Sequence, residues 1–142
     1  MYESYTRQAL PEKHYRELLG TALCVFNSNN AFVIENILRV SDSYIWYELV
    51  DKESGKLKSA LRENICKDGN YEIASTFEEL VEMRNRIIHS FQITDVDNKQ
   101  KLATKTKVNQ GNKQFVIDEN YLMEFIRKND KLSELLHDFR GY

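Results

Sequence analysis

The chain contains few residues that interrupt helices, with one proline, Pro11, and five glycines among 142 residues. Its 42% hydrophobic and 30% charged residues are typical of a globular protein and exclude a long disordered chain. A chain of this length fits one domain, in which a single core buries roughly two-thirds of the unfolded surface. We therefore expect one mainly helical domain over residues 1–142.

Cysteine is also scarce. Cys24 and Cys66 lie far apart, without a CxxC pair or a neighbouring histidine, so the spacing of a metal site is missing. No apolar run approaches the roughly 20 residues that cross a membrane. The first ten residues, MYESYTRQAL, lack the charged and apolar blocks of a signal peptide. These absences predict a soluble, cytoplasmic protein with reduced thiols, no cofactor, no metal and no membrane partner.

Excess positive charge is absent too, since the formal net charge is -2 and the isoelectric point is near 5.9. Nucleic-acid binding therefore needs a local basic patch. The densest basic stretch contains five lysines: Lys99, Lys101, Lys105, Lys107 and Lys113. Alternate lysines on one face of a hairpin can hold an RNA backbone. Lysines that protect a solvated edge strand against aggregation explain the same pattern.

Helical periodicity runs through most of the chain. Apolar residues recur at helical spacing over Pro11–Phe26, then over Phe32–Leu49 as one long helix or two short ones, and over Leu57–Ile65. The polar run Asn27–Asn30 is interpreted as a break between the first two helices and as an N-cap. A last helix is predicted from Asp118 to about Phe139.

One segment has a different period. Residues Lys101–Val108 alternate with a period of about two, and Gln114–Ile117 follow across the polar turn Asn109–Asn112, which predicts a β-hairpin. The expected fold class is all-α: an up-down bundle of about five helices with a small β-hairpin before the C-terminal helix.

A further helix is expected from the capping box at Ser75 and Thr76, each followed three residues later by glutamate, to about Gln92. At about 100° per residue, one arc of this helix is apolar and contains Phe77, Leu80, Val81, Ile87, Ile88 and Phe91. Arg84 lies at the middle of that arc. Because a buried unpaired charge is costly, Arg84 is expected to meet a carboxylate, a wet cleft or a subunit interface.

Asn85 and His89 are neighbours on the flank of the same arc, since they stand at i and i+4. The segment from Arg84 to His89 resembles the RxxxxH signature of the HEPN superfamily, in which a polar residue such as asparagine commonly follows the arginine. The resemblance covers about one helix. It implies an all-helical homodimer in which two copies of this helix build one composite cleft.

Many HEPN proteins are metal-independent endoribonucleases of toxin–antitoxin, phage-exclusion and CRISPR-linked systems. The resemblance therefore implies a ribonuclease that acts as a toxin or antiviral effector, with RNA as substrate and an antitoxin or regulatory protein as a further partner. One HEPN subgroup has a modifiable tyrosine two residues after the histidine. Phe91 stands at that position here, so this route of regulation is unavailable at this residue.

RNA cleavage without a metal starts with attack of a ribose 2′-hydroxyl on the adjacent 3′-phosphate. His89 is the candidate general acid or base, because imidazole exchanges protons near neutral pH. Arg84 would hold the phosphate oxygens through its fork of N–H groups, and Asn85 would position the phosphate or His89. The alternatives are a catalytically idle module that binds nucleotide, RNA or protein, and a helical protein in which Arg84 makes a structural ion pair.

Arg86 points to the side of the helix opposite Arg84. It is a candidate RNA contact together with Lys101, Lys105 and Lys107 of the predicted hairpin. The interpretation we favour for Arg86 is an ion pair with Glu82, four residues earlier on the same helix.

Overall fold

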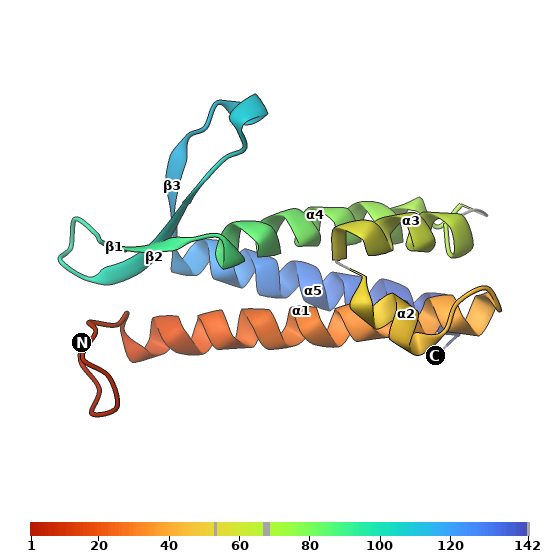
Figure 1. Cartoon of the computed structure of the whole chain (residues 1–142), viewed down its shortest axis with the longest axis horizontal. Coiled ribbons are helices and arrows are strands. Elements are labelled where there is room, and N and C mark those ends of the chain that lie inside the picture. The colour runs from red at the N-terminus through yellow and green to blue at the C-terminus, as the bar shows by residue number, and fades with distance from the viewer. Residues whose placement is uncertain (53, 67–68, 142) are drawn as a thin grey trace.

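The computed structural model describes residues 1–52, 54–66 and 69–141. In this part of the chain the elements follow the order α1 (Lys13–Val40), α2 (Trp46–Asp51), α3 (Ser54–Asn64), α4 (Tyr71–Ile88), β1 (Phe91–Thr94), β2 (Gln100–Lys105), the 3-10 turn η1 (Val108–Gln110), β3 (Gln114–Ile117) and α5 (Glu119–Arg140). Helices α1, α4 and α5 lie side by side along the molecule, and the strands are at one end (Figure 1). No helix among the described residues is long and apolar enough to cross a membrane.

The expected all-α class is wrong, because a three-stranded antiparallel sheet in the order β1-β2-β3 accompanies the helices. The predicted hairpin is confirmed: Lys105 pairs with Gln114, and Leu102 pairs with Ile117. The additional strand is β1, which the sequence predicted to be the end of a helix. Phe91 fits the apolar arc of a helix, but it also begins an alternating segment that pairs with β2, and this pairing determines its conformation.

Helix α4 begins and ends earlier than predicted. Asn70 stands at the N-cap position, whereas Ser75 and Thr76 lie inside the helix and form no capping box. The Ser75 hydroxyl donates instead to the carbonyl oxygen of Tyr71 at 3.1 Å. At the other end, the helix stops at Ile88 and His89 occupies the C-cap.

The predicted break at Asn27–Asn30 is also wrong, because α1 continues through it as one helix of 28 residues. Asn29 is buried, and its amide Nδ2 donates to the carbonyl oxygen of Asn129 at 2.7 Å and to the side-chain Oδ1 of Asn129 at 3.0 Å. A side chain predicted to cap a new helix therefore joins α1 to α5.

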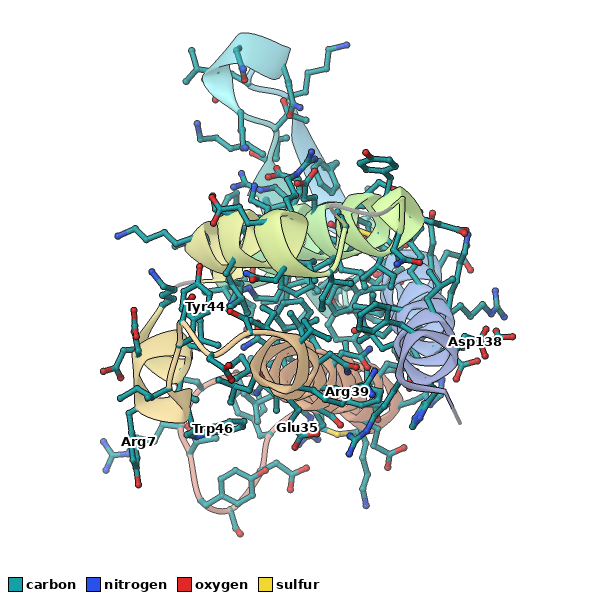
Figure 2. The ribbon with its side chains drawn as sticks, turned by 90° about the vertical axis from the view of Figure 1, so that its right-hand side faces the viewer. Arg7, Glu35, Arg39, Tyr44, Trp46 and Asp138 are labelled. Carbon is teal, nitrogen blue, oxygen red and sulfur yellow. The ribbon has the colours of Figure 1, made fainter. Side chains whose placement is uncertain are left out.

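Three aromatic rings unite the long helices in the core. Phe26 of α1 stacks on Phe77 of α4, with ring centroids 6.3 Å apart, and on Phe125 of α5 at 6.0 Å. Seen along the bundle, side chains fill the space between α1, α4 and α5 (Figure 2). This packing fixes the position of α4, which carries the candidate site.

A tyrosine attaches the sheet to the bundle. The buried hydroxyl of Tyr15 in α1 donates to the carbonyl oxygen of Ile117 at 2.5 Å and accepts the N–H of Leu102 at 3.1 Å. It therefore bridges two paired residues of β3 and β2. The hairpin consequently leaves the bundle at a fixed place, next to the C-terminal end of α4 (Figure 1).

Candidate functional site

The C-terminal end of α4 brings Asn85 and His89 together. The backbone N–H of His89 donates to the carbonyl oxygens of Asn85, at 3.0 Å, and of Ile87, so the two residues lie one helical turn apart. His89 is exposed and Asn85 is half-buried. Among the described residues, the imidazole of His89 makes no hydrogen bond or ion pair, so it is available for contact with a substrate.

Arg84 faces the inside of the bundle. Its guanidinium carbon lies 5.1 Å from the centroid of the Phe26 ring on α1, a cation–π contact. The apolar residues that flank it on the predicted arc, Phe77, Leu80, Val81 and Ile87, are buried within the same chain. Ile88 and Phe91, the last two residues of the arc, are exposed, so only part of this face is buried without a second copy of the chain, and the homodimer stays a prediction.

Arg86 lies on another side of α4 and contacts the hairpin. Its Nη1 donates to the carbonyl oxygen of Lys105 at 2.8 Å, and its Nε lies 3.4 Å from Oε1 of Glu82. The predicted pair of Arg86 and Glu82 is confirmed. The structure adds Lys107, whose Nζ lies 3.0 Å from the other carboxylate oxygen of Glu82. One carboxylate therefore bridges two cations.

The lysines of the hairpin differ in the groups that they contact. Lys101 lies 2.9 Å from a carboxylate oxygen of Asp95 and 3.0 Å from one of Asp97. Hydrogen bonds to these two groups raise the pKa of Lys101, and the same bonds lower the pKa of each carboxyl. Lys105 donates instead to Oδ1 of Asn112 at 2.5 Å. The charge of Lys101 is therefore neutralised by two carboxylates, whereas Lys105 contacts a neutral amide.

Tyr121 is a neighbour of this region that the sequence did not indicate. Its hydroxyl donates to the carbonyl oxygen of Met83 at 3.3 Å, and burial together with the negative charge of Glu82 raises its pKa to about 12. No local pattern links the residue to α4, because 38 positions separate it from Met83.

Metal-ligating side chains are dispersed: within the described ranges, no group of three or more histidine, cysteine, aspartate or glutamate residues is arranged to hold a metal ion. Cys24 is an exposed free thiol, and Cys66 is a buried one whose pKa is raised by burial.

Comparison with known proteins found no family model, no curated protein and no solved structure that matches this chain. The resemblance to the HEPN superfamily therefore depends on the segment from Arg84 to His89.

Proposed function

We propose that the protein is a metal-independent endoribonuclease of the HEPN type, acting as a toxin or antiviral effector in the cytoplasm. The observation that carries the proposal is the position of His89. Its imidazole is exposed one turn from Asn85, on the end of α4 that Arg86 joins to the cationic hairpin. A flexible RNA strand has access to such a position.

In the proposed reaction, the ribose 2′-oxygen forms a bond to phosphorus and the bond from phosphorus to the 5′-oxygen breaks. The products are a 2′,3′-cyclic phosphate and a 5′-hydroxyl. One proton leaves the 2′-hydroxyl and one is delivered to the 5′-oxygen, so the reaction needs a base and an acid. His89 performs one of these transfers, and His89 of a second copy performs the other in the proposed homodimer.

Arg84 and Asn85 act on the phosphate in this proposal. The Asn85 amide donates to a phosphate oxygen or orients His89. Arg84 stacks on Phe26 through the flat face of its guanidinium, whereas it would bind phosphate through the N–H groups at its edge. The contact with Phe26 does not itself use those N–H groups.

The test is cleavage of a labelled RNA by the purified protein in the presence of EDTA. His89→Ala is expected to lower the cleavage rate about 10²- to 10⁴-fold, because it removes proton transfer. The control is His137→Ala, since His137 is an exposed histidine near the C-terminal end of α5. Circular dichroism checks that both variants fold. Cleavage that requires an added metal, or equal losses in the two variants, would contradict the proposal.

A binding module without catalysis is the second candidate. The observation in its favour is that Lys107 of the hairpin is held by Glu82, and Arg86 of α4 by Glu82 and the carbonyl oxygen of Lys105, in contacts that do not involve His89. RNA binding without any cleavage, unchanged in His89→Ala, would support this function and exclude the ribonuclease.

A further inference from the structure

The outer part of the hairpin, residues 105–114, is a well-defined projection that we call the arm. Inside it, the Thr106 N–H donates to the carbonyl oxygen of Lys113 at 2.8 Å, and the carbonyl oxygen of Lys107 accepts the N–H groups of Gln110 and Asn112 at 2.9 and 3.1 Å. The arm extends beyond α4 (Figure 1), and its outer end stands apart from the helices when the molecule is viewed along the bundle (Figure 2). Its shape is therefore fixed before any ligand binds.

The arm is cationic, since residues 105–114 include three lysines and no acidic residue. All of these residues except Thr106 are exposed. Within the described part of the chain, Lys105 and Lys113 have no acidic partner, whereas Lys107 is paired with Glu82 at the root of the arm. An anionic strand bound along the arm would therefore reach Lys107 and Arg86 near α4. Both cations are already in contact with the carboxylate of Glu82.

The contact between Glu82 and Arg86 is poorly aligned. The Arg86 side chain is only 18% exposed, and its Nε is buried without a hydrogen bond to any described residue, although Glu82 lies 3.4 Å away. A hydrogen bond to a charged group weakens steeply when it is long or bent. Arg86 is also held by the carbonyl oxygen of Lys105, so its position does not depend on Glu82.

A phosphate group can contact two cations through two of its oxygens, as a carboxylate does. Its oxygens also accept hydrogen bonds from the N–H groups at the edge of a guanidinium. We propose that Glu82 is an internal competitor for RNA, whose carboxylate occupies a phosphate site made by Arg86 and Lys107 at the root of the arm. This inference rests on the proposed function, because RNA is taken as the ligand. Removal of the charge of Glu82 then strengthens RNA binding.

The experiment measures the affinity of a short labelled RNA for Glu82→Gln in the His89→Ala background, where the RNA stays intact. We expect the dissociation constant to fall about fivefold or more at low salt. The slope of log affinity against log salt should steepen by about one, because one further phosphate is bound. Thermal unfolding checks that the variant is folded.

Glu78→Gln is the matched control. Glu78 lies on the same helix and pairs with Arg62 at 2.5 and 2.7 Å, so its substitution removes the same charge and releases a cation away from the arm. Both variants reduce the general repulsion of RNA equally, and only Glu82→Gln opens the proposed site. Equal affinities for the two variants would overturn the inference.

Lys107→Gln supplies the reciprocal test at an exposed position. It should weaken RNA binding several-fold in the Glu82→Gln background and change it little where Glu82 is retained, because Lys107 is then already occupied. Equal effects in both backgrounds would contradict the competitor role. If the protein without the His89 substitution cleaves RNA but these differences are absent, only this inference fails. If it neither binds nor cleaves RNA, the proposed function fails as well.

Discussion

Arg84 makes one contact that a helical wheel does not suggest. The wheel places the charge within an apolar arc and predicts a carboxylate, a wet cleft or a subunit interface as its partner. In the structure the guanidinium lies over the ring of Phe26, which itself stacks on Phe77 and Phe125. An aromatic face attracts a cation through its quadrupole, so the contact with Phe26 favours the charge of Arg84 beside apolar side chains.

The stability of Arg84→Gln tests this contact. We expect the free energy of unfolding to fall by about 1–2 kcal/mol, because the variant loses the cation–π contact and the packing of the arginine methylene groups. Urea denaturation measures the change. The control is Arg127→Gln, since Arg127 is an exposed arginine on α5. Unchanged stability in both variants would mean that the contact with Phe26 contributes nothing to the fold.

At the scale of elements, two buried asparagines contribute to the pairing of α1 with α5. Asn29 and Asn129 are 5% and 1% exposed and stand 100 positions apart. Asparagine near the middle of a polar run is typical of a helix end, because its side chain competes for backbone groups. Here the Asn29 amide donates its hydrogen bonds to Asn129 of α5, and helix α1 continues past Asn29.

Asn29→Leu is expected to lower the free energy of unfolding by about 1–3 kcal/mol, because Oδ1 of Asn129 then stays buried without its donor. The double variant Asn29→Leu with Asn129→Leu should recover part of this loss, since both polar groups are removed. Denaturant titration of the single and double variants measures the coupling, with the exposed Asn27→Leu as control. A double variant whose loss equals the sum of the single losses would argue against the pair.

At the scale of the whole molecule, the buried Tyr15 and the half-buried Tyr121 connect the bundle, the sheet and the site. The Tyr15 hydroxyl bonds to β2 and β3, and the Tyr121 hydroxyl bonds to α4. Burial raises the pKa of both phenols, that of Tyr121 to about 12, from an ordinary value near 10. The protonated phenols are therefore favoured in the folded state.

Stability should consequently fall as the pH rises above about 10. Between about pH 10 and 12 the unfolded chain releases these protons while the folded protein keeps them, so the unfolded state binds fewer protons and the free energy of unfolding decreases. Denaturant titrations at a series of pH values measure the slope. Tyr121→Phe should make it shallower, whereas Tyr47→Phe, at a side chain 77% exposed, should not. An identical slope in Tyr121→Phe would contradict this account.

The sequence by itself determined the features that depend on neighbours a few positions apart. These are the predominance of helix, the hairpin of β2 and β3, and the pair of Glu82 and Arg86, because helical spacing, strand alternation and i to i+4 contacts are local. It also indicated that Asn85 and His89 share one flank of α4. The exposure of His89 was decided by the point at which α4 ends.

Only the tertiary structure decided the remainder, because the partners are distant in sequence. Strand β1 exists through its pairing with β2, and α1 continues because Asn129 satisfies Asn29. Arg84 lies over Phe26, and Lys107 shares Glu82 with Arg86. A local pattern identifies the face on which a side chain lies, whereas the group opposite that face is determined by how the whole chain packs.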